Sequence, residues 1–192
     1  MKVEEKPREA AIEVWPRWAK RGMLLSLLAT GLAGQEVPDG QIEDRLGRCE
    51  MGAEEAKELA ESTANSRERN PEEKIQLLGS LGARCHERGR YDAGEPLLRR
   101  ALTIVEGVLG PEHPSTATSL NNLAELLRRK GDYVAAEPLC RRALAIREKA
   151  LGPEHPSTAV SLSNLAELLK SKGDHAGAEP PCRRALAIRE KV

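Results

Sequence analysis

The C-terminal half of the chain repeats itself with a period of 42 residues. Residues 110–150 and 152–192 are identical at 32 of 41 positions when one segment is aligned on the other. A fixed period of roughly 20 to 50 residues indicates a stacked array, because one unit of that length cannot bury its own apolar face. The repeat therefore limits the fold to units that pack against copies of themselves.

A more diverged copy lies one period nearer the N-terminus. Five residues of the later copies recur there at the same spacing, namely Gly89, Tyr91, Glu95, Pro96 and Ala101. A fainter trace over residues 53–62 has the pattern of the second half of a fourth unit, displaced by about one residue. We expect an array over 71–192, with units at 71–109, 110–151 and 152–192, after a degenerate helical region over 41–70.

Each unit has the pattern of two helices. An apolar stripe at i, i+3, i+4 and i+7 indicates the first helix, formed by Leu120, Leu123, Ala124 and Leu127. A second stripe follows it, formed by Ala136, Leu139, Cys140, Ala143 and Leu144. Small residues dominate where the two stripes meet, so the helices can form a close antiparallel hairpin. We therefore expect an all-α fold in which the first helices line an extended concave face.

Three residues predict the boundaries of these helices, and a fourth predicts a bend. Pro114 suits a first helical turn, because its missing N–H would have no intrahelical partner there. Gly131 is expected to end the first helix, and Asp132 to cap the second by accepting a hydrogen bond from an early backbone N–H. Pro138 lies inside the second helix, where it removes one backbone hydrogen bond and is expected to bend the first turns.

These residues resemble the tetratricopeptide repeat family. Its packing positions match Leu123, Ala124, Gly131, Tyr133, Ala136 and Ala143, and the 42-residue period is similar to the kinesin light chain subclass. The resemblance covers roughly residues 75–192 and implies a right-handed superhelical solenoid that binds a protein or peptide, without implying transport by a motor. The chain departs from the family pattern at Gly94, Cys140, Pro181 and Cys182.

Side chains beside the apolar stripe of the first helix are the candidate groove residues. They are Asn121, Asn122, Glu125, Arg128 and Arg129 in one unit and Ser163, Asn164, Glu167 and Lys170 in the next, flanked by Thr118, Val160 and Ser171. The amides of Asn122 and Asn164 can donate to and accept from the backbone of an extended peptide. Arg128, Arg129 and Lys170 would favour an acidic ligand or a terminal carboxylate. The alternative is that all of these residues are ordinary exposed helix positions.

Composition and motif spacing argue against nucleic-acid binding and catalysis. Lys plus Arg and Asp plus Glu number 30 each, and the chain has two Trp, two Tyr and no Phe, so basic patches with stacking aromatics are not expected. His113 and His155 recur beside Glu112 and Glu154, but copies one unit apart cannot converge, so we expect a role in the turn. His86 and His175 are expected at the surface. We expect no enzyme activity, metal site or cofactor.

The four cysteines are Cys49, Cys85, Cys140 and Cys182, and no two are spaced as C-x-x-C. Their spacing therefore favours neither a zinc site nor a redox pair. We expect all four to be reduced. The sequence places them as small apolar residues on the packing stripes, where a free thiol behaves as a hydrophobe.

The segment 1–40 allows two interpretations. An apolar run from Met23 to Ala33 follows Lys20 and Arg21, as in an export signal, although acidic residues precede it. Otherwise residues 10–32 form an amphipathic helix that docks on the array or lies in a membrane interface. The run is too short to span a bilayer. We expect a cytoplasmic protein, with export as the alternative.

Two functions fit the array. The first is a module that binds an extended peptide or partner protein through the concave face. The second is a scaffold piece that forms homo-oligomers through an uncapped repeat end, because the last unit would leave apolar surface exposed. That surface is expected to include parts of Leu162, Leu165, Leu169 and Leu186.

Overall fold

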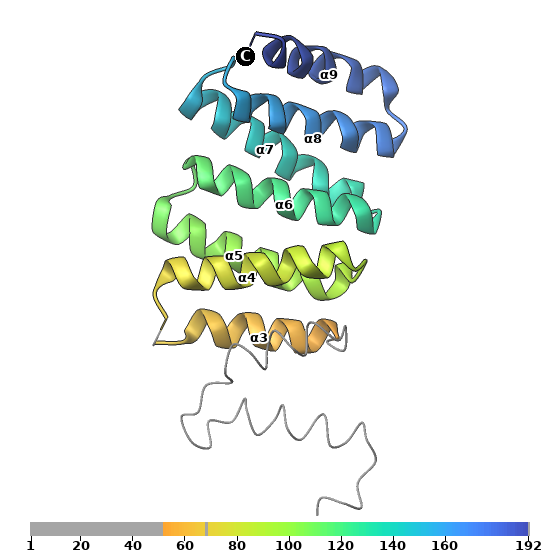
Figure 1. The fold of residues 1–192 in the computed structure, drawn as a ribbon. Coiled ribbons are helices and arrows are strands. Elements are labelled where there is room, and N and C mark those ends of the chain that lie inside the picture. Colours follow the sequence, from red (N-terminus) through yellow and green to blue (C-terminus); the bar gives the residue numbers. More distant parts are fainter. Residues whose placement is uncertain (1–51, 68, 192) are drawn as a thin grey trace, which may run out of the picture. The chain divides into compact units, whose positions relative to one another are not determined.

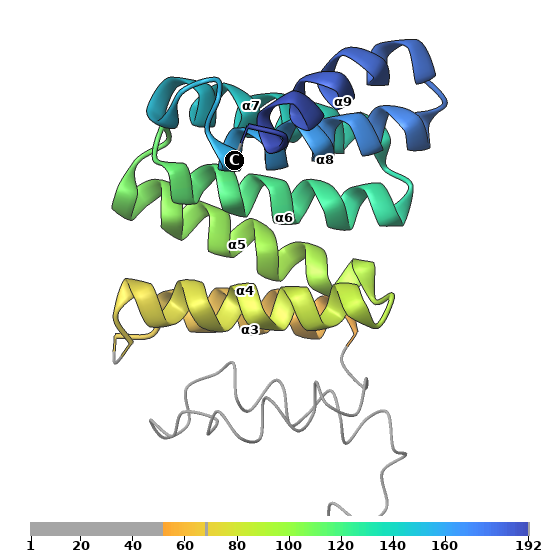
Figure 2. The same cartoon turned by 45° about the horizontal axis from the view of Figure 1, so that its top comes forward.

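The computed structural model describes residues 52–67 and 69–191, and these residues form seven α-helices and no strand. The helices are α3 (Ala53–Asn65), α4 (Pro71–Glu87), α5 (Tyr91–Leu109), α6 (Pro114–Lys130), α7 (Tyr133–Leu151), α8 (Pro156–Lys172) and α9 (His175–Arg189). The pairs α4–α5, α6–α7 and α8–α9 form three hairpins that stack in chain order (Figures 1 and 2). The predicted all-α stack of helical hairpins is confirmed.

Some expectations fall on residues that the structure does not describe. Segment 1–40, its apolar run Met23–Ala33 and Cys49 lie outside the described residues, as does the first part of 41–70. Within the described part of the chain, no helix has the length and apolar character needed to cross a bilayer.

Helix α6 begins and ends, and helix α7 begins, where the sequence predicts. Pro114 is the first residue of α6, and Gly131 follows the last with φ of +90°, a left-handed conformation that favours glycine. The Asp132 side chain accepts a hydrogen bond from the Ala135 N–H, 3.1 Å away, at the start of α7. Helix α7 continues through Pro138, in its second turn.

The three hairpins contribute to a shared core cluster. Leu123, Leu127 and Cys140 of the middle hairpin are buried together with Leu98 of the preceding hairpin and Leu168 of the following one. No hairpin therefore buries its apolar stripes by itself, which is the arrangement expected of a repeat array.

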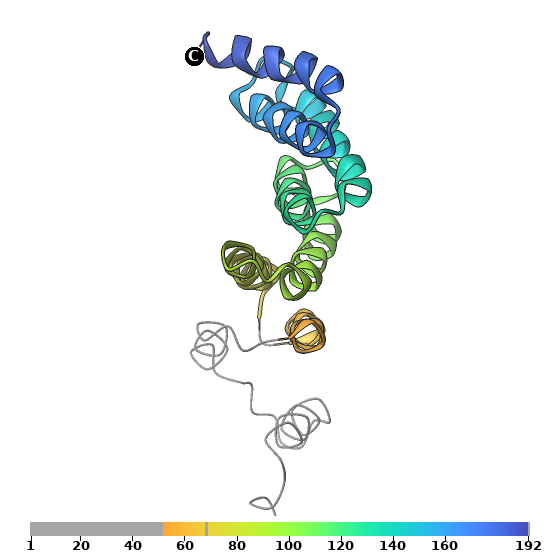
Figure 3. The same cartoon turned by 90° about the vertical axis from the view of Figure 1, so that its right-hand side faces the viewer.

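The first helices of the hairpins lie opposite the second helices α5 and α7. Figure 3 shows α4, α6 and α8 on one side and α5 and α7 on the other, with the array curving toward the first helices. The concave side is therefore lined by α4, α6 and α8.

Helix α3 packs differently from the later second helices. Helices α5 and α7 each pack against the first helix of the next hairpin, whereas α3 packs mainly against α5 and only slightly against α4. Its contact with α4 is supplemented by Lys74, whose Nζ donates to the carbonyl oxygens of Ala64 and Ser66 at 2.9 and 2.6 Å. Helix α3 therefore covers the end of the first hairpin without reproducing the regular stacking.

Ion pairs between hairpins recur with the period of the sequence. Lys130 of α6 lies 2.9 Å from Glu95 of α5, and one unit later Lys172 of α8 lies 2.7 Å from Glu137 of α7. A second series joins successive second helices, through the pairs Arg142–Glu106 at 2.6 Å and Arg184–Glu148 at 2.5 Å. Exposed pairs of this kind contribute less than about 1 kcal/mol each. Their main effect is to fix the same register at each junction.

The first hairpin distributes its core volume differently from the second. Gly82 of α4 occupies the position of Ala124 in α6, and Leu98 of α5 occupies the position of Cys140 in α7. A Cβ atom at residue 82 would lie 2.5 Å from Cδ2 of Leu98. The smaller residue on the first helix thus makes room for the larger residue on the second.

The expectation that the cysteines fill apolar stripes is correct for two of the three described cysteines. Cys85 and Cys140 are buried, whereas Cys182 is exposed and its place on the packing face is taken by the buried Pro181. None of these three cysteines forms a disulfide bond in the described part of the chain. Burial raises the pKa of the Cys140 thiol to about 12.

We predict that iodoacetamide modifies Cys182 at least about tenfold faster than Cys140 in the folded protein at about pH 8. The thiolate is the reactive form, and a thiol whose pKa is raised by burial stays protonated until the pH approaches that raised value. Mass spectrometry of peptides after timed labelling measures each rate. Equal rates in the folded chain would contradict the assignment, and unfolding the chain in urea should remove the difference.

Candidate functional site

Two adjacent first helices each carry an asparagine at the same position of the repeat. Asn122 of α6 is exposed and Asn164 of α8 is half-buried, and the two residues occupy equivalent positions in their units. Both belong to helices that line the concave side.

Asn121 does not face the groove. It is only 4% exposed, and its Nδ2 donates to the hydroxyl of Ser161 on α8 at 3.0 Å. Its carbonyl oxygen is buried without a hydrogen-bond partner among the described residues. Asn121 thus belongs to the packing between α6 and α8, which differs from the expectation that it contacts a ligand.

The basic residues of α6 are occupied by ion pairs within the chain. Arg128 donates two hydrogen bonds to Glu125, at 2.7 and 2.6 Å, and one to the Ser171 hydroxyl on α8 at 3.0 Å. Arg129 donates to the same Glu125 carboxylate at 3.0 Å. Burial alone would raise the pKa of Glu125, but the bonds from both arginines hold it below its ordinary value. Arg128 and Arg129 are therefore committed to the array, which weakens the argument for an acidic ligand.

Two candidate residues of α8 also contact other side chains of the array. Glu167 lies 3.7 Å from Arg128, and the Ser163 hydroxyl accepts from Arg189 at 2.9 Å. Lys170 is exposed, with its Nζ 3.9 Å from Sγ of Cys182.

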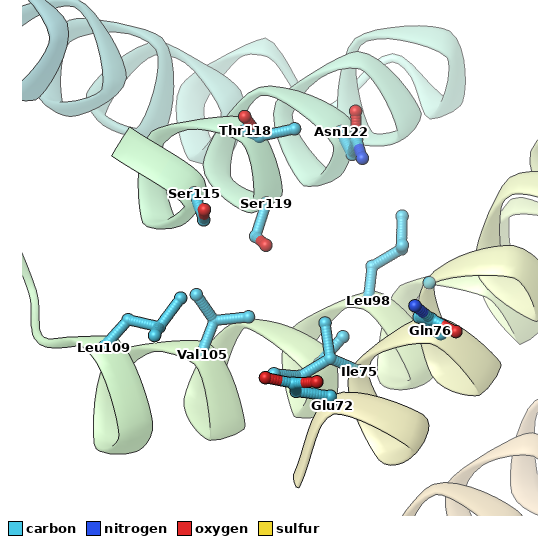
Figure 4. A pocket seen from close by; sticks show the side chains of 12 residues that line it. Glu72, Ile75, Gln76, Leu98, Val105, Leu109, Ser115, Thr118, Ser119 and Asn122 are labelled. Carbon is cyan, nitrogen blue, oxygen red and sulfur yellow. The ribbon is translucent and has the colours of Figure 1, made fainter. Parts of the chain in front are cut away.

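A pocket of about 380 Å³ opens between α4 and α6 (Figure 4). Side chains of α5 and Ile75 of α4 form its apolar wall, and polar side chains of α4 and α6 surround it. The lining residues are Glu72, Ile75, Gln76, Gly79, Leu98, Ala101, Val105, Leu109, Ser115, Thr118, Ser119 and Asn122. Figure 4 shows the α4 and α5 side chains facing those of α6 across the open space.

A buried arginine occupies the equivalent place one unit later. Arg147 of α7 is 7% exposed, and its guanidinium donates to the Ser157 carbonyl, the Ser161 hydroxyl and the Thr118 hydroxyl at 2.7, 3.1 and 3.2 Å. It forms no ion pair with a described residue, and burial lowers its pKa. The junction between α6 and α8 is thus closed by a network of hydrogen bonds.

Neither the pocket nor the Arg147 network was predicted. The signal was present in the alignment of the repeats, where Val105 and Gly79 stand at the positions of Arg147 and Asn121. Both replacements remove side-chain volume and hydrogen-bonding groups from the first junction. The sequence alone does not reveal the effect of these replacements, because only the structure shows that all four residues face the gap between first helices.

The repeated histidines are helix caps. Nδ1 of His113 accepts a hydrogen bond from the Ser115 N–H at 3.1 Å, and Nδ1 of His155 accepts from the Ser157 N–H at 3.0 Å. This confirms their role in the turn. The expectation of a surface position is wrong for His86, which is half-buried 3.8 Å from Glu125 and 6.0 Å from the Tyr91 ring.

Comparisons with solved structures show the same fold. BtubC (BKLC) from P. vanneervenii is 24% identical with a TM-score of 0.62, and the match covers 91% of this chain but 64% of BtubC. The kinesin light chain TPR-like repeats of Podospora anserina are 21% identical with a TM-score of 0.62, covering 95% of this chain and 94% of theirs. The TPR domain of Arabidopsis FLU is 15% identical with a TM-score of 0.56, covering 64% of this chain and 100% of that domain. Kinesin light chain repeats are thus among the solved structures that share the fold of this chain.

The comparison with protein families agrees with the fold. The search of curated proteins finds no match. The model of the tetratricopeptide repeat family matches residues 73–139 and 117–191, which together cover more than half of the chain and all three hairpins. On the strength of this match, together with the stacked hairpins, the chain belongs to the tetratricopeptide repeat family.

Proposed function

We propose that the chain binds an extended segment of a partner protein along the concave face formed by α4, α6 and α8. The observation that carries the proposal is the open pocket between α4 and α6, which lies between first helices of adjacent units and has exposed polar groups at its edge. Tetratricopeptide repeats generally mediate protein–protein interactions, and stacked repeats present extended concave surfaces for them.

Asn122 supports this function because it lies at the edge of the pocket and has no committed partner among the described residues. Asn164 repeats the same amide one unit further along the groove. An amide donates and accepts at once, so the pair can hold the backbone of an extended segment whatever its side chains are. The arginines of α6 contribute less to this surface, because both already form ion pairs with Glu125.

The double substitution Asn122→Ala and Asn164→Ala is predicted to weaken partner binding by about tenfold or more while changing the melting temperature little. The partner is first captured with the immobilised full-length chain and identified by mass spectrometry. Its affinity for the wild-type and variant chains is then measured by titration calorimetry.

The matched control replaces two exposed residues of the second helices, Lys149 and Arg183, by alanine. Their side chains are 73% and 79% exposed. This control should bind the partner as the wild type does. If the control loses binding and the asparagine variant keeps it, the partner uses the convex side and the proposed groove is wrong.

Self-assembly through the last hairpin receives less support. Three of the four leucines expected to be exposed there are buried: Leu162, Leu165 and Leu169 are 2%, 7% and 5% exposed. Leu186 alone is exposed, at 57%. The apolar surface that the scaffold hypothesis requires is thus reduced to one of its four residues, and peptide binding in the groove is the better-supported function.

A further inference from the structure

We infer that the pocket between α4 and α6 selects partner segments in which a large apolar side chain stands next to a lysine or arginine. This inference rests on the proposed function, since it specifies which sequence the concave groove recognises. It adds a ligand chemistry that differs from the acidic ligand expected from the basic residues of α6.

The two junctions between first helices differ in the side chains that fill them. Between α6 and α8, Arg147 and Asn121 cross the gap and bond to Ser161. Between α4 and α6, the equivalent residues are Val105 and Gly79, which cannot reach the equivalent Ser119. Space that the array fills with its own side chains at one junction is thus left open at the other.

The open space has an apolar floor and the volume of a small ligand pocket. Leu98 and Val105 form a packed floor, 5% and 2% exposed, while Leu109 is 44% exposed and provides accessible apolar surface beside Ile75. A volume of about 380 Å³ lies at the lower end of the roughly 300–1,000 Å³ found for ligand pockets. The pocket therefore suits one large aliphatic or aromatic side chain better than a folded surface.

The lining of the pocket carries a negative charge. Glu72 is the one charged residue among those that line the pocket, and the equivalent residue in the next unit is Pro114. Glu72 is exposed and forms no ion pair or side-chain hydrogen bond with a described residue, and Figure 4 shows its carboxylate beside Ile75 at the pocket. A carboxylate placed beside an apolar site attracts a neighbouring lysine or arginine and repels an acidic residue.

The rim supplies groups for the backbone of the bound segment. Ser115, Ser119, Gln76 and Asn122 surround the apolar wall with hydroxyls and amides. These neutral groups can bond to backbone amides on either side of the anchored residue, and they do not select side chains. Sequence selection therefore falls to the apolar wall and to Glu72.

The experiment is a selection of phage-displayed random decapeptides on the immobilised full-length chain. Enriched peptides are expected to place a large apolar residue next to lysine or arginine. For a synthetic fluorescent copy of the most enriched peptide, Val105→Arg is expected to weaken binding by about tenfold or more, because it introduces the residue that closes the next junction. Glu72→Gln should weaken binding by about threefold, and Glu72→Lys should shift the selected sequences toward acidic neighbours.

Ser119→Leu fills the same pocket from α6 and keeps the test valid if Val105→Arg fails to fold. Circular dichroism melting establishes which variants fold. Enrichment of acidic peptides, or equal binding by wild type and both filled variants, would overturn the inference. Self-association abolished by Val105→Arg would overturn it too, because the occupant would then be a second copy of the chain.

The outcomes separate this inference from the proposed function. If the enriched peptide loses affinity with Asn122→Ala and Asn164→Ala but not with the filled pocket, groove binding holds and the pocket assignment is wrong. If no peptide is enriched, the pocket assignment is wrong, and the capture experiment with the intact partner decides whether the groove binds at all.

Discussion

Replacing Arg147 by alanine is expected to lower the free energy of unfolding by about 2–3 kcal/mol. The guanidinium bonds to groups of both α6 and α8, so its loss removes two hydrogen bonds to the next hairpin and one within its own, and leaves a cavity at the junction. Part of this loss is offset, because the alanine variant no longer buries a charge without an ion-pair partner. Chemical denaturation followed by circular dichroism measures the change.

Two further variants separate the causes. Arg147→Lys should recover little stability, because a single ammonium cannot reproduce the planar set of bonds to three acceptors. Arg142→Ala removes an exposed arginine of the same helix, 42% exposed and paired with Glu106, and should cost less than about 1 kcal/mol. A loss at Arg147 no larger than that at Arg142 would show that the buried network does not hold the junction together.

Gly82→Ala is expected to destabilise the chain by about 1–2 kcal/mol although alanine is the better helix former. The added methyl would lie 2.5 and 2.6 Å from Cδ2 and Cγ of Leu98, which is 5% exposed and has little room to move. Combining the change with Leu98→Cys reproduces the pair found in the next hairpin. The combined variant should therefore lose at least about 1 kcal/mol less than the sum of the two single changes.

Gly79→Ala provides the control in the same helix. No atom lies within 4 Å of the position where its Cβ would be, so this change should stabilise the chain by about 0.5–1 kcal/mol through helix propensity alone. Denaturation of the five chains, wild type included, gives a double-mutant cycle and its control. If the losses of stability at Gly82 and Leu98 are purely additive, the small residue at 82 does not compensate for the large residue at 98.

Much of the fold was predictable because each unit repeats the same local signals. The stripe through Leu120 and Leu127, the glycine at 131 and the cap at Asp132 are set by residues close in sequence, and the structure bears them out. The packing of α3 was harder to predict from the sequence. Helix α3 packs mainly against α5 and not α4, and this depends on contacts with residues distant in sequence.

The candidate site was harder to predict. Helical periodicity shows which residues lie beside the apolar stripe of a helix, but it does not show which residues of the next repeat pack against them. Asn121 and Asn122 are neighbours in sequence, yet one is buried against Ser161 and the other remains exposed at the groove. The bond from Arg128 to Ser171 likewise joins residues in different units. Which side chains remain available to a ligand is therefore decided by the adjacent repeat.

The ion pairs that recur between hairpins have an evolutionary consequence. Because Lys130–Glu95 and Lys172–Glu137 follow the 42-residue period, an extra unit inserted by duplication would arrive with the partners that its neighbours require. Recombination between the two nearly identical stretches could add or delete such a unit in one step, without a new interface having to arise by point mutation. Related chains can thus differ in the number of repeats while keeping the same junction, and the length of the groove can change faster than its chemistry.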